Sequence, residues 1–163
     1  MLPYAFRTAT LPVNGEPRQR ARYPQAERAA DVLAVSANPT LAAYFSAVFR
    51  PSGWTIARTH TLAAAIEFLR SNRTAVAVFE NALPGAVWQD ALAALESLPE
   101  APALIVVGDE SSLVDEVTAA GGFDALIRPL RESDVVWTLA SAWHSWIKRH
   151  EGVAKGVHRC SGA

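Results

Sequence analysis

Hydrophobic residues in the middle of the chain fall into two alternating kinds of run. Short, β-prone apolar runs predict buried strands, because continuous apolar stretches are typical of strands covered on both faces. The predicted strands are residues 31–35, 54–58, 75–79, 103–107 and 124–127. The segments between them carry apolar residues at helical spacing, as in Leu41, Tyr44, Phe45, Val48 and Phe49.

Local signals mark where the predicted helices begin and end. Asn38 and Thr61 each precede a helical stripe and are suitable N-caps. Gly121 follows the fourth predicted helix, 112–120, and is expected to end it. The third helix is expected over 87–97 and the last from about residue 133. Strict alternation of strands and helices predicts an α/β fold with a parallel sheet and helices on both faces.

The two ends of the chain lack this pattern. Residues 1–28 contain four prolines and five arginines without apolar periodicity, which predicts a flexible N-terminal tail. Residues 151–163 contain three glycines and are expected to form a flexible C-terminal tail. One folded domain is therefore predicted over residues 29–150.

Composition narrows the class of protein. Of the 163 residues, 50% are hydrophobic and the net charge is −1, so no global charge points to nucleic acid or an anionic membrane. The single cysteine, Cys160, excludes an internal disulfide. No secretory signal and no membrane-length apolar run occurs, so a cytoplasmic protein is expected. Neither histidine metal-binding spacing nor a glycine-rich phosphate loop is present, and we expect no cofactor and no enzymatic activity.

In a parallel α/β sheet the functional crevice lies at the carboxyl ends of the strands. Ser36 and Ala37 follow the first predicted strand, and Glu80 ends the third. Val107 ends the fourth, and Arg128 follows the fifth. These five positions are the candidate site.

Four segments together resemble the receiver domain of two-component response regulators, the CheY-like fold. They are VLAVSANPT, FENALPG, ALIVVGDE and AAGGFDALIRPL, and they occur in the family's order at about its spacing. The resemblance spans roughly Asp31 to Ile147. It implies a flavodoxin-like (βα)5 fold, a doubly wound five-stranded parallel sheet with strand order 2-1-3-4-5.

The resemblance also implies a chemistry that this sequence does not follow. In the family, two acids after the first strand help to hold Mg²⁺, and an Asp at the end of the third accepts a phosphoryl group. A Ser or Thr after the fourth strand and a Lys before the proline contact that group. Ser36 and Ala37 stand at the acid positions, and Glu80 stands at the phosphoacceptor. Val107 and Arg128 stand at the Ser/Thr and Lys positions.

These departures predict a degenerate receiver, or pseudo-receiver, without a metal site. The switch aromatic of the family is also replaced, by Ala125. The Glu80 carboxylate is expected to face the Arg128 guanidinium, and a bond between them could approximate the phosphorylated state of the family. The alternative is that Glu80 is a solvated carboxylate at a site that has no function. The loop acids Asp109 and Glu110 could in principle supply a replacement metal site, but two adjacent acids on a surface loop are expected to be solvated.

Three tryptophans on the last predicted helix mark a candidate interface. Trp143 and Trp146 lie on its apolar stripe, whereas Trp137 falls on a different face. We expect the domain to signal through a protein partner: a histidine kinase, another regulator, an output protein, or a second copy bound through the last helix. No membrane partner is expected, and no nucleic acid for this chain alone. The alternatives are the receiver-like part of an RNA-binding antiterminator (ANTAR-type) regulator and a flavodoxin-like small-ligand binder.

Overall fold

Five parallel strands form one sheet in the order β2-β1-β3-β4-β5. The computed structural model describes residues 30–162, and the surroundings of the side chains within residues 30–150. The strands are β1 (Ala30–Val35), β2 (Ile56–Thr59), β3 (Thr74–Glu80), β4 (Ala103–Gly108) and β5 (Asp124–Ile127). The predicted fold class and strand order are therefore confirmed.

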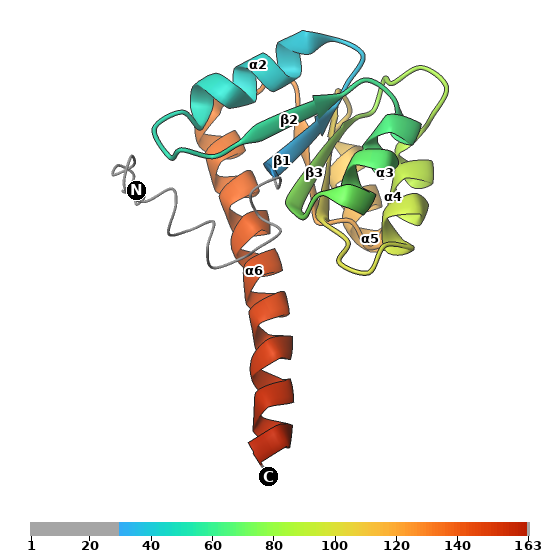
Figure 1. Cartoon of the computed structure of the whole chain (residues 1–163). Coiled ribbons are helices and arrows are strands. Elements are labelled where there is room, and N and C mark those ends of the chain that lie inside the picture. Colours follow the sequence, from blue (N-terminus) through green and yellow to red (C-terminus); the bar gives the residue numbers. More distant parts are fainter. Residues whose placement is uncertain (1–29, 163) are drawn as a thin grey trace.

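Helices cover both faces of this sheet (Figure 1). One face packs against α2 (Pro39–Val48) and α6 (Glu132–Gly162). The other packs against α3 (Leu62–Ser71), α4 (Trp88–Glu96) and α5 (Ser112–Ala120). Two apolar layers thus enclose the central strands.

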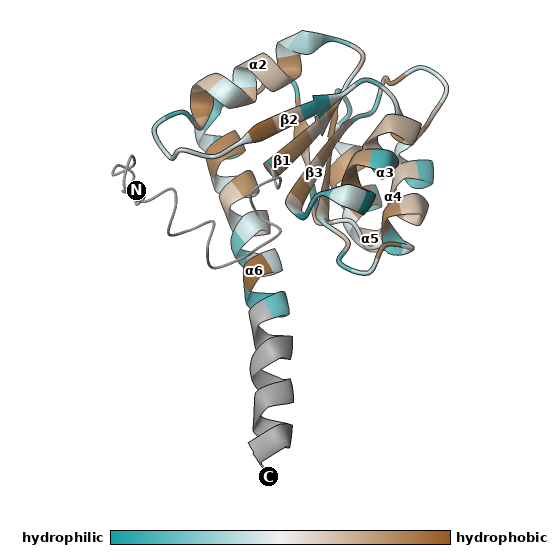
Figure 2. Cartoon of the chain, viewed as in Figure 1, coloured by the Kyte–Doolittle hydropathy of each residue, from teal (hydrophilic) through white to brown (hydrophobic). Residues whose placement is uncertain are grey.

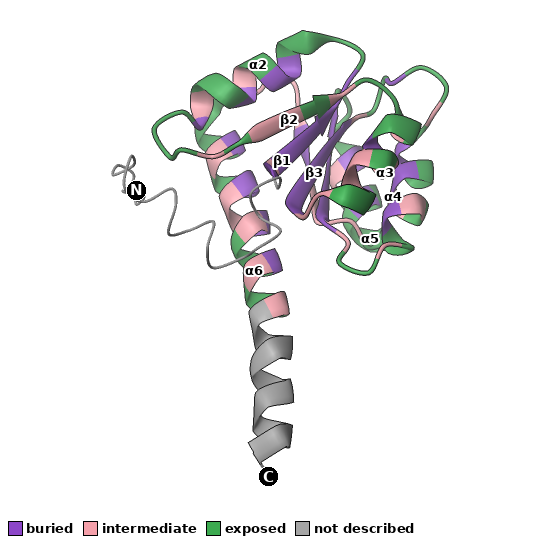
Figure 3. Ribbon diagram, in the orientation of Figure 1, coloured by how far each residue is buried: buried purple, intermediate pink, exposed green. Residues whose placement is uncertain are grey.

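The central strands are buried because both of their faces are covered. Every residue of β4 is buried, and in β3 only the last, Glu80, is partly exposed. Figures 2 and 3 show β1 and β3 as largely apolar and buried. Neighbouring side chains point to opposite faces, so Val78 joins the layer under α2 and α6, while Phe79 joins the layer under α3, α4 and α5. The continuous apolar run predicted this double burial.

Three predicted helix ends are found at the expected residues, Asn38, Thr61 and Gly121. The Asn38 side chain accepts from the Thr40 N–H at 2.9 Å, and Thr61 Oγ1 accepts from the Ala64 N–H at 3.1 Å. Gly121 has a φ of 111°, a left-handed conformation that costs glycine little, and it ends α5.

The second strand was predicted two residues too early. The ladder with β1 begins where Ile56 pairs with Val32, so β2 starts at Ile56 and not at Trp54. The Trp54 ring instead stacks on Phe49 at 4.6 Å and on Trp143 at 5.6 Å between centroids. Aromatic packing against α2 and α6 takes the place of strand pairing.

The last helix is longer than predicted. α6 runs to Gly162, through the segment expected as a tail over 151–163, and extends past the edge of the sheet (Figure 1). A glycine within a helix costs about 1 kcal/mol relative to alanine, and this segment contains no proline to break the ladder. Those glycines therefore did not mark a helix end. The predicted N-terminal tail, 1–28, lies outside the described residues.

Over the described part of the chain, no helix combines the length and apolar character needed to span a membrane.

Asp31 joins three elements at the amino end of β1. Its carboxylate accepts from the Thr55 N–H at 2.8 Å, just before β2, and from Trp143 Nε1–H at 3.2 Å on α6. Burial raises the pKa of Asp31 above its ordinary value of 3.8, and the bonds from Thr55 and Trp143 offset part of that rise. The folded state consequently holds the Asp31 proton more tightly than the unfolded chain does.

Asp31→Asn is expected to remove a pH-dependent part of the stability. Because the folded pKa lies above the unfolded one, Asp31 favours the folded state most at and below the ordinary value of 3.8. This contribution is lost as the pH rises through the raised pKa. Urea unfolding between about pH 4 and pH 8 should show the free-energy difference, wild type minus variant, falling with pH. A constant difference across this range would contradict the assignment.

Candidate functional site

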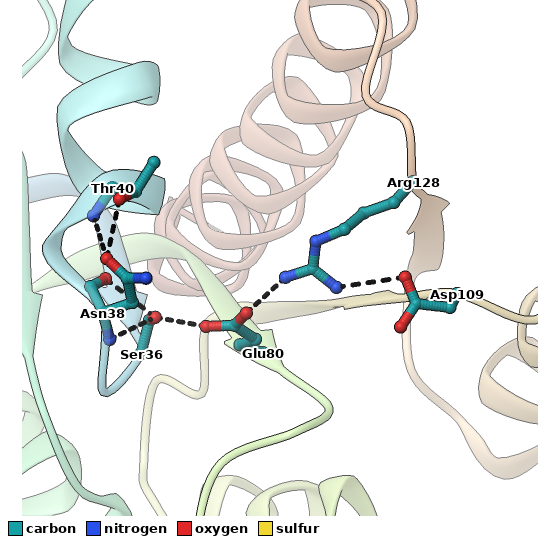
Figure 4. Close-up of polar contacts among 6 residues, drawn as sticks. All are labelled: Ser36, Asn38, Thr40, Glu80, Asp109 and Arg128. Carbon is teal, nitrogen blue, oxygen red and sulfur yellow. Dashed lines mark hydrogen bonds and ion pairs between the residues drawn. The ribbon is translucent and has the colours of Figure 1, made fainter.

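The carboxyl ends of four strands bring the candidate residues together. The register pairs Val35 with Phe79, Glu80 with Val107 and Gly108 with Ile127. The residues that end or follow these strands therefore share one edge of the sheet. Figure 4 shows the side chains of Ser36, Asn38, Thr40, Glu80, Asp109 and Arg128 as one connected group.

Glu80 and Arg128 form the predicted ion pair. Arg128 Nη2 donates to Glu80 Oε2 across the gap between the ends of β3 and β5 (Figure 4). The Glu80 side chain is 18% exposed and that of Arg128 33%, so the pair is shielded from bulk water on most sides. A charge-assisted bond in such a place is stronger than one at an open surface.

Ser36 holds the other oxygen of the same carboxylate. Ser36 is fully buried, and its hydroxyl lies within bonding reach of Glu80 Oε1 and, at 2.9 Å, of the Asn38 carbonyl oxygen. A hydroxyl has one proton to donate, and the carboxylate is the stronger acceptor. Both oxygens of Glu80 are thus engaged within the protein. From the sequence, Ser36 was noted only as standing where the family has an acid, and this bond was not predicted.

The same network continues into the start of α2. Ser36 Oγ accepts from the Asn38 N–H at 3.0 Å. Asn38 Oδ1 in turn accepts from the N–H of Thr40 at 2.9 Å and from its Oγ1–H at 2.7 Å. Asn38 therefore caps the helix and positions Ser36 at once, and only the capping role was visible in the sequence.

Asp109 is a second carboxylate partner of Arg128. Its Oδ1 lies 3.6 Å from Arg128 Nη1, and its side chain is 74% exposed. Screening by water makes this outer pair weak. The planar guanidinium of Arg128 can nevertheless direct one Nη group to each of the two acids. The ammonium group of a lysine is a compact point charge and is less suited to bonding two acids at once. Asp109 is thus largely solvated and also faces Arg128.

The remaining candidate positions offer no polar group to this network. Val107 is fully buried in the layer beneath α2 and α6, and Ala125 is buried on the opposite face. Ala37 is exposed but carries neither charge nor hydrogen-bonding side-chain atoms. The donor expected of a Ser or Thr at position 107 is therefore missing from the site.

The Mg²⁺ that the receiver resemblance implies does not fit these residues. Mg²⁺ takes hard oxygen ligands, usually from more than one carboxylate. At the three matched positions only Glu80 is an acid, and a guanidinium and a hydroxyl occupy its oxygens. Among the described residues, no three His, Cys, Asp or Glu side chains gather in a way that could hold a metal ion.

The three tryptophans of α6 have different surroundings. Trp137 is 75% exposed and lines a groove of about 240 Å³ together with Ala125, Leu126, Ile127, Leu130, Arg131, Asp134 and Thr138. Trp146 is buried, and Trp143 is partly buried against Trp54. The rings of Trp143 and Trp146 pack within the domain, in keeping with their place on the apolar stripe of the helix. Trp137 alone of the three presents its ring to solvent.

Comparison with known proteins finds similarity to solved structures only. No protein-family model and no curated protein matches the chain. Solved structures of several receiver domains match the chain. One is the signal receiver domain of an HD domain-containing protein from Pseudomonas fluorescens Pf-5, with a TM-score of 0.66 at 16% identity over 76% of this chain and 93% of that one.

Two further structures agree. The chemotaxis response regulator CheY4 of Vibrio cholerae has a TM-score of 0.61 at 18% identity, covering 70% of this chain and 98% of that one. The beryllofluoride-activated NtrC4 receiver domain dimer has a TM-score of 0.63 at 18% identity, covering 71% and 97%. The chain therefore has the CheY-like fold of response-regulator receiver domains, as its sequence predicted.

Arg128→Met is expected to lower the free energy of unfolding by about 1–2 kcal/mol, between the values typical of exposed and of buried pairs. The variant leaves the shielded Glu80 carboxylate without its cation. The matched control is Arg131→Met, because Arg131 pairs with Asp134 at 3.1 Å where the side chains are 77% and 54% exposed. That change should stay within about 0.5 kcal/mol. Equal losses in the two variants, measured by urea unfolding, would show that the inner pair is no stronger than a surface pair.

Proposed function

We propose that this chain acts as an atypical receiver domain of a two-component-type signalling pathway, through protein contacts and without conventional aspartyl phosphorylation. The observation that carries the proposal is the Glu80 carboxylate, bonded by Ser36 on one oxygen and by Arg128 on the other. The position where a receiver accepts a phosphoryl group is thus already neutralised. No catalytic role is assigned to any residue of the site.

The chemistry of phosphoryl transfer supports this proposal. Such transfer depends on a positioned nucleophile and on cations that neutralise the developing charge. Glu80 extends one methylene further than an aspartate, which displaces its oxygens by more than about 1 Å and disturbs in-line geometry. Val107 provides no hydrogen bond to a phosphoryl oxygen, and the metal ligands are missing at Ser36 and Ala37.

The inner network also supports a fixed functional state. In the family, the residue after strand four and the Lys before the strand-five proline contact the phosphoryl group. Here the Glu80 carboxylate reaches Arg128 without any added group, and Arg128 also faces Asp109. We therefore propose that the pair holds the domain in one arrangement that needs no kinase to be adopted.

The proposed contact surface is the face formed by α5, β5 and α6, which we call the Trp137 face. The exposed Trp137 ring and the adjoining groove lie side by side on it. A patch that carries both a projecting aromatic and a groove suits a two-fold interface, where each copy offers both parts. Self-association through the Trp137 face is our first candidate partner interaction.

A second candidate is the receiver-like part of an RNA-binding antiterminator regulator. The observation in its favour is the length of α6, which continues as one helix from Glu132 to Gly162. The regulators of that type join a degenerate receiver to their RNA-binding part by a long last helix. Within the described residues, no comparable observation favours a small-ligand binder.

Treatment with acetyl phosphate and Mg²⁺ is expected to leave the wild-type protein unmodified. Intact mass spectrometry should detect no phosphoryl adduct, because Glu80 is ion-paired and no metal site neutralises the transferred charge. Beryllofluoride with Mg²⁺ should likewise leave the amide NMR spectrum unchanged. A conventional receiver domain treated in parallel provides the positive control. An adduct that disappears in Glu80→Gln would refute the proposal.

Trp137→Ala is expected to weaken self-association at least tenfold, since buried tryptophans at interfaces commonly contribute more than about 1.4 kcal/mol. Sedimentation equilibrium over a range of concentrations would measure this change. Because Trp137 is exposed within one copy, its replacement should leave the melting temperature almost unchanged. Glu67→Ala, an exposed change on α3, is the matched control. Equal association by both variants and wild type would exclude the Trp137 face as the dimer surface.

A further inference from the structure

Two indole groups attach α6 to the sheet where the helix leaves it. Trp143 Nε1–H donates to the Asp31 carboxylate at 3.2 Å, at the start of β1. One turn later, Trp146 Nε1–H donates to the Ala101 carbonyl oxygen at 3.1 Å, just before β4. In the sheet, β3 lies between β1 and β4, so the two acceptors flank the helix from either side.

Each indole ring is also fixed by its neighbours. Trp143 belongs to an aromatic stack with Trp54 and Phe49, at centroid distances of 5.6 Å and 4.6 Å. Stacked rings with satisfied N–H groups resist both sliding and rotation.

Trp146 is held between two nitrogen-bearing groups. The Arg73 guanidinium carbon lies 4.9 Å from the centre of its ring, a cation–π distance. The His150 ring packs at 4.2 Å between centroids, and His150 Nδ1 lies 2.8 Å from the Trp146 carbonyl oxygen. These contacts come from the loop after α3 and from the next turn of α6.

The other end of the same helix is fixed at the opposite edge of the sheet. α6 follows directly on the segment that contains Arg128, whose side chain is paired to Glu80. Between the two ends, Val135, Leu139 and Ala142 are fully buried against the sheet. From its first turn to Trp146, α6 therefore contacts the sheet along the whole length of the domain.

We propose that the two bonds Trp143–Asp31 and Trp146–Ala101, which we call the indole clasp, fix the axial position and direction of α6. The extension of α6 to Gly162 is then a rigid arm whose orientation is set by the domain. A helix turned by one residue rotates by about 100° and would lose both bonds at once. The inference goes beyond the function proposed above, and it holds or fails without regard to Glu80.

Paired nitroxide labels would test whether the arm is rigid. The only cysteine, Cys160, lies within α6, and Ala119→Cys on the exposed side of α5 supplies the second site. Residue 160 lies about 21 Å along the helix from Trp146, so a tilt of 10° moves it by about 4 Å. Double electron–electron resonance on the labelled protein, diluted with unlabelled protein to remove distances between copies, should therefore give a single narrow distance distribution for the intact clasp.

The Trp143→Phe, Trp146→Phe double variant removes both indole donors and keeps aromatic rings in place. We expect its distance distribution to broaden or become bimodal, while Trp137→Phe, on the same helix outside the clasp, leaves the distribution narrow. An unchanged distribution in the double variant would overturn the proposal, because packing alone would then fix the helix. If the double variant does not fold, the wild type still decides: a broad distribution in it would refute a rigid arm.

Discussion

The parallel register of β3 between β1 and β4 is the constraint on which the site depends. Because β3 is packed on both faces, a slip of its register by one residue would move every side chain into the opposite apolar layer, where it would not fit the residues packed there. That register fixes Glu80 opposite Val107 and sets the end of β1 beside the end of β3. Ser36 and Arg128 are separated by more than half of the chain, yet they reach the same carboxylate for this reason.

The charges of the inner site balance without an added ion. A partly buried carboxylate alone would be costly, and a metal or a cationic side chain must compensate for it. Here the Arg128 guanidinium supplies the cation and the Ser36 hydroxyl supplies a neutral donor. The uncharged side chains of Ser36 and Ala37 and the cation of Arg128 are therefore parts of one electrostatic arrangement. An additional dication would have to compete with that guanidinium for the Glu80 carboxylate.

The sequence predicted the features that depend on periodicity and topology. Apolar runs gave the sheet and its two covered faces, and the rule that strand ends share an edge predicted that Glu80 would face Arg128. The bond from Ser36 to Glu80 was not predicted, because it depends on side-chain rotamers and on the short turn from Ser36 to Asn38 that precedes α2. Trp54 was misplaced because β-prone residues pair only where a partner strand is in register.

The end of α6 shows a different limit of sequence reasoning. Glycines weaken a helix but do not end it without a cap or a proline, so composition alone could not locate the terminus. The tryptophans were likewise ambiguous in sequence, since helical spacing separates Trp137 from the apolar stripe but does not identify acceptors. Asp31 and Ala101, which accept from the indoles, lie 112 and 45 residues away along the chain.

One helix connects the inner site with the indole clasp. α6 begins just after Arg128 at the carboxyl edge of the sheet and meets Asp31 and Ala101 at the amino edge. Transmission of a signal along such a helix would require two alternative arrangements, each stabilised at one of the two ends. The described structure instead satisfies both ends together, with Arg128 paired to Glu80 and both indoles bonded. This simultaneous attachment of α6 at both ends supports the single fixed arrangement proposed above for the domain.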